Sequence, residues 1–212
     1  AEIADSSRNI KPEEVQQAKA SGIDPVEHVI AYDGIAVIVH PSNPLKEISV
    51  KTLSDIFSGK TTSWSALGQK GMGDIQIVSR DSPSGTYEAF KELVVTMKGK
   101  DATRDFAPQA LAQASNEAVL QLVAQTKNAV GYVGMGYVDN TVKAIPVIGL
   151  DGGQAVPPTP ANVLNGTYPI SRKLFCYTNG EPSGILKVYM DWIKGPEGQA
   201  CAKEAGFVPL AG

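Results

Sequence analysis

Four residues between positions 80 and 86 have the side chains and the spacing needed to bind an oxyanion. Arg80 follows a short apolar, β-branched stretch, and Ser84, Gly85 and Thr86 come shortly after it. The guanidinium offers a planar fork of donors, the two hydroxyls donate hydrogen bonds, and Gly85 lets the backbone approach a ligand closely. These residue types match the tetrahedral oxygens of phosphate.

The elements around these residues are predicted to place backbone N–H groups at the same point. Residues 75–79 have the pattern of a strand and residues 88–93 suit a helix, so Ser84 to Thr86 fall at the N-cap and first turn of that helix. The first N–H groups of a helix have no partner within it, and its dipole is positive there. A serine-capped helix beside a surface arginine is the alternative that this pattern fits equally well.

Other chemistries find little support in the sequence. A G-x-x-x-x-G-K-[ST] loop and a G-x-S-x-G elbow are both missing. His28, His40, Cys176 and Cys201 do not have the spacing of metal ligands, and the adjacent acids at 13 and 14 fit a solvated helix start better than an acid–base pair. We therefore predict no catalytic residue, no metal and no cofactor, and a protein that is not an enzyme.

Composition favours a soluble domain. The 212 residues are 42% hydrophobic and 19% charged, which is enough for a sizeable core, and the net charge of −3 argues against a nucleic-acid surface. No apolar run approaches the roughly 20 residues that span a bilayer. Ala1 does not begin a signal peptide, so we expect a mature or cut chain.

Strands and helices are predicted to alternate along the chain, which is typical of α/β architecture. Helices are expected over residues 12–21, 50–57, 115–125 and 183–193, and strands over residues 29–39, 75–78, 130–133 and 174–178. Taken locally, Asp33 and Gly34 suggest a hairpin turn inside the first of these strands. The Gly- and Pro-rich residues 149–165 are predicted to form a surface loop.

Sequence blocks along nearly the whole chain carry a family resemblance. They are Ala4 to Arg8 (A-D-S-S-R), residues 31–39 with 41–44, residues 53–60 with Trp64, Arg80 with Ser84 to Thr86, and residues 128–134, 168–172 and 198–210. In this order they resemble the periplasmic phosphate-binding proteins, the substrate-capturing components of ABC-type phosphate importers.

The resemblance implies a two-lobed α/β fold, the type II periplasmic-binding-protein fold, with hinge strands that cross between the lobes. Residues 1–39 and 166–212 would form the first lobe, and residues 40–165 the second lobe with the Arg80 site. Residues 29–39 would then be one long strand. The family normally begins with a strand, an anion-binding loop and a helix before the A-D-S-S-R block, so we expect an incomplete first lobe in a chain that is a fragment or is completed by a second polypeptide.

The resemblance also implies the ligand set Arg80, Ser84, Gly85, Thr86 and Ser7. Ser7 aligns with an acidic ligand that accepts a hydrogen bond from protonated phosphate in the family. A carboxylate there disfavours fully ionised sulfate, whereas a serine can donate to either anion. Asp5 is two residues away, is expected on the same strand face, and is an alternative acidic ligand.

The function implied is capture of inorganic phosphate in a cleft between the lobes for an ABC importer, whose membrane subunits are the expected partners. The location would be periplasmic or on the cell surface. Two alternatives remain: binding of sulfate, molybdate or tungstate, and a structural or interaction protein derived from a binding-protein lobe. The exported location implies a disulfide between Cys176 and Cys201, the alternative being two buried free thiols.

Overall fold

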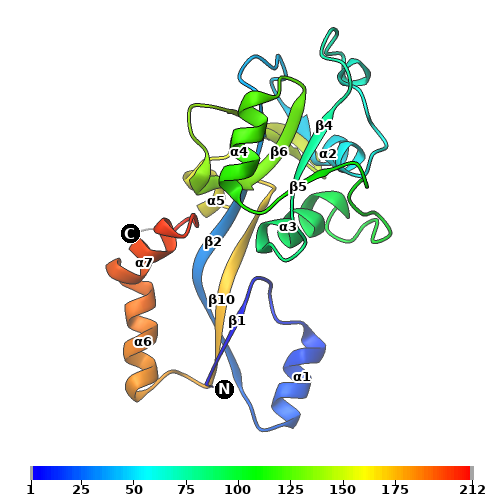
Figure 1. Cartoon of the computed structure of the whole chain (residues 1–212). Coiled ribbons are helices and arrows are strands. Elements are labelled where there is room, and N and C mark those ends of the chain that lie inside the picture. The colour runs from blue at the N-terminus through cyan, green and yellow to red at the C-terminus, as the bar shows by residue number, and fades with distance from the viewer. Residues whose placement is uncertain (1, 211–212) are drawn as a thin grey trace. The chain divides into compact units, whose positions relative to one another are not determined.

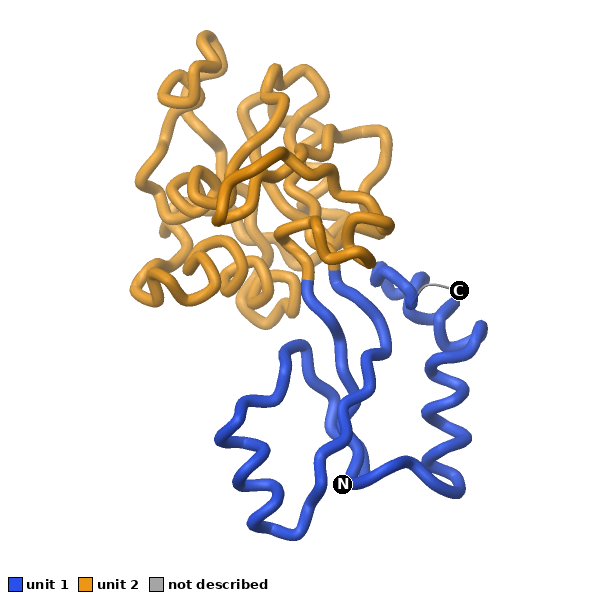
Figure 2. The backbone as a smooth tube through the Cα atoms, turned by 180° about the vertical axis from the view of Figure 1, so that it is seen from behind, with its two compact units in different colours: residues 1–33, 172–212 blue, residues 34–171 orange. Residues whose placement is uncertain are grey.

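The structure, a computed structural model of the chain, describes residues 2–210 and separates into two compact units (Figures 1 and 2). Unit 1 combines residues 1–33 with 172–212, and unit 2 is the continuous segment 34–171. Strand β2 (Pro25–Val39) carries the chain out of unit 1, and β10 (Ser171–Asn179) carries it back. The assignment of these units to the two predicted lobes, and the completeness of either lobe, stay predictions.

A mixed sheet forms the centre of unit 2. Its strands follow the order β2, β6 (Ala129–Gly134), β4 (Gln76–Arg80) and β5 (Leu111–Gln113), with the short β7 (Lys143–Ala144) also on β2. β6 runs antiparallel to β2, and β4 runs parallel to both β6 and β5. Parallel neighbours need crossover connections, and helices supply them here. The predicted α/β architecture is confirmed.

The helices of unit 2 begin where the sequence provides a cap. Ser49 caps α2 (Val50–Phe57), Ser84 caps α3 (Gly85–Phe90) and Ser115 caps α4 (Asn116–Gln125); each serine oxygen accepts an N–H of the first turn. A π-helical turn, η2 (Lys91–Val95), continues α3. Two short 3-10 helices, η1 (Trp64–Leu67) and η3 (Met135–Tyr137), also lie in unit 2.

The segment 149–165 differs from the predicted surface loop. It contains most of a small second sheet, in which β8 (Val147–Gly149) pairs with β9 (Gly152–Val156) and with β3 (Ile48–Ser49), followed by α5 (Pro160–Leu164). Gly152 and Gly153 have φ angles of 81° and 95°, and such glycines also suit the tight reversal of a hairpin. Pro160 stands at the first helical position of α5, where its missing N–H costs nothing. The glycines and the proline that suggested a loop therefore lie at the turns and ends of regular elements.

Close packing joins α4 to the sheet of unit 2. Val119 and Val123 of α4 are fully buried, and a Cβ built on Gly131 of β6 would lie 2.9 Å from a methyl of Val123. Only a glycine lets the helix approach the strand this closely. Gly34 of β2 also allows a close approach, because a Cβ built on it would lie 2.8 Å from the Met135 methyl. Asp33 and Gly34 both lie inside the continuous strand β2, so the hairpin turn suggested by the local sequence is wrong.

Unit 1 contains three strands and three helices among its described residues. β1 (Ile3–Ser6) is an edge strand of the same seven-stranded sheet and pairs antiparallel with β10. β10 is in turn the neighbour of β2. The helices are α1 (Pro12–Ala20), α6 (Gly184–Lys194) and α7 (Pro196–Glu204). Gly195 and Pro196 end α6 as predicted, and Pro196 then opens α7 at its first position.

The two cysteines are free, and the predicted disulfide is wrong. Cys176 is buried on β10 opposite Asp5 of β1, and its thiol donates to Asp5 Oδ1 at 2.8 Å. Burial, with Asp5 as a second cause, raises the pKa of Cys176 to about 12. Cys201 is exposed on α7. The Cys176 thiol, which was predicted to pair with Cys201, thus forms a hydrogen bond with its cross-strand neighbour Asp5.

Candidate anion-binding site

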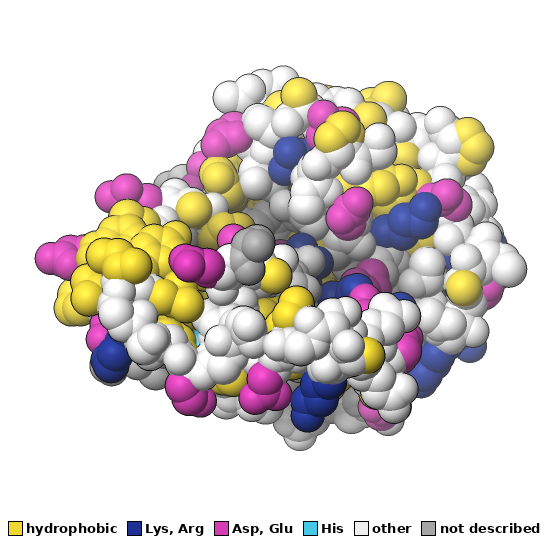
Figure 3. Space-filling model, turned by 90° about the horizontal axis from the view of Figure 1, so that it is seen from below, with side chains coloured by type: hydrophobic (Ala, Val, Ile, Leu, Met, Phe, Trp, Pro, Cys, Tyr) yellow, Lys and Arg dark blue, Asp and Glu magenta, His cyan; other side chains and the backbone are white. Residues whose placement is uncertain are grey.

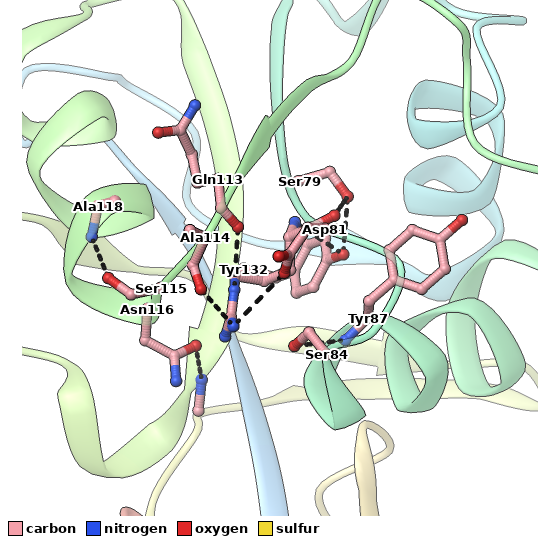
Figure 4. Close-up of polar contacts among 12 residues, drawn as sticks. Ser79, Asp81, Ser84, Tyr87, Gln113, Ala114, Ser115, Asn116, Ala118 and Tyr132 are labelled. Atoms are coloured by element: carbon pink, nitrogen blue, oxygen red, sulfur yellow. Dashed lines mark hydrogen bonds and ion pairs between the residues drawn. The ribbon is translucent and has the colours of Figure 1, made fainter.

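The guanidinium of Arg80 is held by backbone carbonyls at the end of β5 (Figure 4). Nε donates to the carbonyl of Gln113 at 3.2 Å and Nη2 to that of Ala114 at 3.0 Å. The parallel register, in which Arg80 lies beside Gln113, brings these groups together. The side chain is 11% exposed, and within residues 2–210 Nη1 has no hydrogen-bond partner. The protein therefore orients the Arg80 guanidinium through Nε and Nη2.

Two carboxylates lie near the guanidinium of Arg80. Asp81 Oδ1 lies 3.8 Å from Nη2, and the Asp81 side chain is 43% exposed, so water screens the attraction. Glu117 is at the start of α4, where its own amide and the Ser115 hydroxyl lower the pKa of its carboxyl; Arg80 contributes a smaller part. Two carboxylates, those of Asp81 and Glu117, therefore lie near the Arg80 guanidinium.

Ser84 forms the predicted N-cap of the helix that follows Arg80. Its backbone is extended, with φ −74° and ψ 128°, and its Oγ accepts the Tyr87 N–H at 3.4 Å. Its own N–H closes the preceding turn by donating to the Asp81 carbonyl at 3.1 Å. Gly85 opens α3 and Thr86 lies in its first turn, so the structure brings these three residues together after Arg80. We name Arg80, Ser84, Gly85 and Thr86 the Arg80 cradle.

Tyr132 of β6 supports the Arg80 cradle from the core. Its hydroxyl accepts the Arg80 backbone N–H at 3.2 Å and forms a 2.8 Å hydrogen bond with Ser79 Oγ (Figure 4). Its ring stacks on Phe90 of α3, with centroids 3.9 Å apart and an interplanar angle of 2°. Burial raises the pKa of Tyr132 to about 12, so the hydroxyl stays protonated at neutral pH. One side chain thus connects the end of β4 with α3.

Sequence reasoning missed the residues that hold Arg80. Gln113 and Ala114 act through backbone carbonyls, and a carbonyl leaves no signature in residue type. Tyr132 did carry a signal, because a tyrosine inside a buried strand usually finds a partner for its hydroxyl.

Ser7, the fifth predicted ligand, belongs to unit 1 and follows the last residue of β1. Its Oγ accepts from Arg172 Nη1 at 3.0 Å, and Arg172 Nε donates to Asp33 Oδ2 at 3.2 Å. The Asp33 side chain is 7% exposed and that of Arg172 is 15% exposed. Burial raises the pKa of Asp33, while Arg172 opposes that effect. We name Ser7, Asp33 and Arg172 the Ser7 cluster.

Arg172 and Asp33 were not predicted as site residues, although both lie in sequence blocks that carry the family resemblance. Asp5, the predicted alternative acid, has a different role. β1 ends at Ser6, so Ser7 does not share its strand face, and the Asp5 carboxylate accepts the Cys176 thiol. Within residues 2–210, no group of three or more His, Cys, Asp or Glu side chains is arranged to hold a metal ion. In the same range, no helix has the length and apolar character needed to cross a membrane.

Comparison with known proteins gives a consistent set of relatives. A protein-family model described as the PBP superfamily domain matches residues 1–197. The phosphate-binding protein PstS of Pseudomonas aeruginosa is 32% identical over 226 residues, covering 99% of this chain and 68% of that protein. The chain spans 63 to 68% of the length of the curated relatives it matches.

Solved structures agree. A putative phosphate ABC transporter substrate-binding protein with bound phosphate from Clostridium perfringens is 34% identical, with a TM-score of 0.70 over 100% of this chain and 80% of that one. A possible phosphate binding protein from Planctomyces limnophilus is 28% identical, with a TM-score of 0.82 over 99% of this chain and 76% of that one.

Proposed function

Because the chain belongs to the PBP superfamily domain family, we propose that it is an extracytoplasmic solute-binding protein that captures inorganic phosphate for an ABC-type importer. Its partners would be phosphate and the membrane subunits of that importer, and it would carry out no chemical step on its ligand. The relatives named for phosphate binding support this proposal. The observation that carries it is the oriented guanidinium of Arg80, with Nη1 open, beside the N-cap of α3.

In this proposal the Arg80 cradle is the contribution of unit 2 to phosphate binding. Nη1 of Arg80 gives charge-assisted hydrogen bonds to phosphate oxygens. The Ser84 oxygen accepts the Tyr87 N–H, which leaves its hydroxyl hydrogen to donate, and Gly85 and Thr86 provide a backbone that a ligand can approach. Ser7 is the proposed contribution of unit 1.

Replacing Arg80 tests the site. Arg80→Ala is expected to weaken phosphate binding by about 2–5 kcal/mol, against about 1 kcal/mol for Thr86→Val, which removes one hydroxyl. Arg80→Lys is the matched control, because it keeps the charge and loses the fork. Isothermal titration calorimetry with inorganic phosphate measures all three, and equal affinity for wild type and Arg80→Ala would contradict the site.

A different oxyanion is the second candidate ligand, because Ser7 is the residue that the family resemblance aligns with an acidic ligand, and a serine can donate to a fully ionised anion. Sulfate, molybdate and tungstate are the anions to compare with phosphate. Displacement of bound phosphate by each anion, at constant ionic strength, measures their relative affinities. The anion with the highest affinity identifies the ligand.

We further propose that an additional polypeptide segment, from the same protein or from a second chain, covers the apolar face of α6. Along this helix Ile185, Val188, Tyr189 and Trp192 are 80%, 63%, 49% and 44% exposed, and they line a groove together with Ile3 of β1. Figure 3 shows this apolar patch as the large yellow area at the left. Contiguous apolar surface of this kind marks an interaction site, and an edge strand such as β1 accepts a further strand.

Amide exchange tests this covering segment. In protein isolated from its native source, α6 is expected to exchange more slowly than in the 212-residue chain, while β6 exchanges equally in both. Equal exchange of α6 in the two samples would contradict the proposal. It would then favour the alternative of an interaction protein that meets its partner only transiently.

A further inference from the structure

We propose that His28, Thr178 and Lys194 form a pH-sensitive latch, which holds the C-terminal end of α6 against β2 while the imidazole is neutral and releases it when the imidazole is protonated. We name these three residues the His28 latch. All three belong to unit 1. The proposal concerns the attachment of α6 and holds whichever anion the chain binds.

The hydrogen bonds of His28 define the protonation state that the latch needs. Lys194 Nζ lies 3.3 Å from Nδ1, and an ammonium group can only donate, so Nδ1 accepts and carries no hydrogen. Nε2 then holds the ring hydrogen and donates it to Thr178 Oγ1 at 2.9 Å. The Thr178 hydroxyl donates its own hydrogen to the Gly180 carbonyl at 2.8 Å. Every donor in this chain of bonds therefore has an acceptor only while the imidazole is neutral.

Helix α6 has few other attachments to unit 1. It connects the end of β10 to α7 (Figure 1), and Met190 is the one buried residue among its eleven, all of which the structure describes. The segments on either side of α6 are held independently of the latch. The Gly180 N–H donates to the Asp24 carbonyl at 2.7 Å, and Gln199 of α7 donates to the Ile30 carbonyl at 2.9 Å. Helix α6 can therefore loosen while β10 and α7 stay in place.

An open cavity of about 210 Å³ borders the imidazole and gives it access to water. This volume is many times the roughly 10–15 Å³ that one water molecule needs. The charged and titratable side chains that line it are His28, Lys187, Asp191 and Lys194, with Glu181 from the segment after β10. Protons can therefore reach His28 although the residue itself is buried.

The charged groups that face His28 act in opposite directions. Lys187 and Asp191 form an ion pair with each other at 2.5 Å, which leaves Lys194 as the cation directly against the imidazole. Burial lowers the pKa of His28, Lys194 lowers it further, and Glu181 opposes both effects. The surroundings thus favour the neutral ring that the hydrogen bonds require.

Protonation of His28 removes the acceptor on which the latch depends. Nδ1 then carries a hydrogen that faces the donors of Lys194, so the hydrogen bond is lost and two positive charges meet. A histidine whose pKa is lower in the folded chain than its ordinary 6.5 contributes stability in full above pH 6.5, and this contribution is lost as the pH falls through the folded-state pKa. Release of α6 is therefore expected below pH 6.5.

Nitrogen NMR tests the directions of the hydrogen bonds. The chain has two histidines, so His40→Gln leaves His28 as the single imidazole. Long-range proton–nitrogen correlation at about pH 7.5 is expected to show a hydrogen on Nε2 and none on Nδ1. A hydrogen on Nδ1 at that pH would overturn the proposal.

Amide exchange tests the release of α6. Wild type is compared at each pH, from about pH 7.5 to about pH 5, with His28→Gln, whose amide does not titrate in this range. Opening of α6 should rise by about 3- to 10-fold more in wild type as the pH falls, because only wild type loses the Lys194 hydrogen bond. Opening of α7 should change equally in the two proteins. The same rise of α6 opening in both would overturn the proposal.

Lys194→Met separates the latch from a purely structural role of His28, and it needs no change at the histidine. This variant keeps an apolar stem and removes the donor and its charge, so the pKa of His28 should rise and the pH dependence of α6 opening should flatten. Lys203→Met is the matched control, because it removes the same charge from α7, away from the cavity. A His28 titration that is identical in Lys194→Met and Lys203→Met would contradict the latch, even where His28→Gln does not fold.

Discussion

Units 1 and 2 hold their proposed ligand residues with very different amounts of core. Among the described residues, the largest fully buried side chains belong to unit 2 with the exception of Phe175. The large exposed apolar side chains belong to unit 1 with the exception of Leu111. Unit 2 therefore has the larger buried core behind the Arg80 cradle, whereas unit 1 leaves more large apolar side chains exposed.

The supports of the two sites show this contrast directly. Behind Arg80, Tyr132 is stacked on Phe90 and tied to the backbone of β4. Behind Ser7, the support is a buried ion pair between Arg172 and Asp33. A close-packed core positions groups by shape, while a buried ion pair positions them at a desolvation cost. Unit 2 should therefore be the more stable part, and the following experiments test that difference.

Amide exchange should show the largest difference between the units. β4 and β6 lie in the buried sheet of unit 2, while α1 has no buried residue and α6 buries only Met190. Exchange of β6 is expected only through global opening, several kcal/mol above the local opening of α1. Peptide-resolved exchange by mass spectrometry measures both, and equal protection of α1 and β6 would remove the contrast.

Truncation of one aromatic side chain in each unit should follow the same order. Phe90→Ala removes a fully buried ring stacked on Tyr132 and is expected to lower the free energy of unfolding by about 3–5 kcal/mol. Trp192→Ala is the matched control on α6, where the ring is 44% exposed, and should cost less than about 1 kcal/mol. Urea denaturation followed by circular dichroism compares them. A larger cost for Trp192→Ala would show that α6 is covered in solution.

A smaller effect is expected where α4 meets the sheet. Gly131→Ala would place its Cβ 2.9 Å from Val123 and 3.0 Å from Val119, and should cost about 1–3 kcal/mol of unfolding free energy. Gly149→Ala is the control in the same unit, because its Cβ would lie at an ordinary 3.7 Å from Pro169. Denaturation midpoints measure both, and equal midpoints would mean that the packing of unit 2 yields more easily than its burial indicates.

The smallest effect is expected at the surface of unit 1, and it depends on pH. Arg8 forms a two-pronged ion pair with Glu14, at 2.7 and 2.8 Å, and this contact lowers the pKa of Glu14 from 4.5 to about 2. A carboxyl whose pKa is lower in the folded state contributes stability above pH 4.5 and loses it as the pH falls toward 2. The protection of α1 from exchange should therefore fall with pH across this range more steeply in wild type than in Glu14→Gln, the two being compared at each pH. Parallel curves would show that the ion pair does not stabilise α1.

Local sequence determined most of the elements and the position of the Arg80 turn. Serine caps, β-branched runs and glycine stops act between residues a few positions apart, so helices 50–57 and 115–125 and the N-cap at Ser84 were predictable from the printed residues. The segment 149–165 shows the limit of that reasoning. Its glycines and prolines suit a loop, and only the pairing of β9 with β8 makes them the ends of regular elements.

Tertiary structure decided what surrounds the predicted ligands. Ser7 meets Arg172 across 165 positions of sequence, and Arg80 meets two carbonyls more than 30 positions away. Cys176 faces Asp5 rather than Cys201 because the register of β1 on β10 places them opposite each other. Residue types state which groups can donate or accept, but strand register and chain path determine which of them meet. The residue types of the proposed site were therefore visible in the sequence. The groups that orient these residues were not, because backbone carbonyls and distant side chains are brought together only by folding.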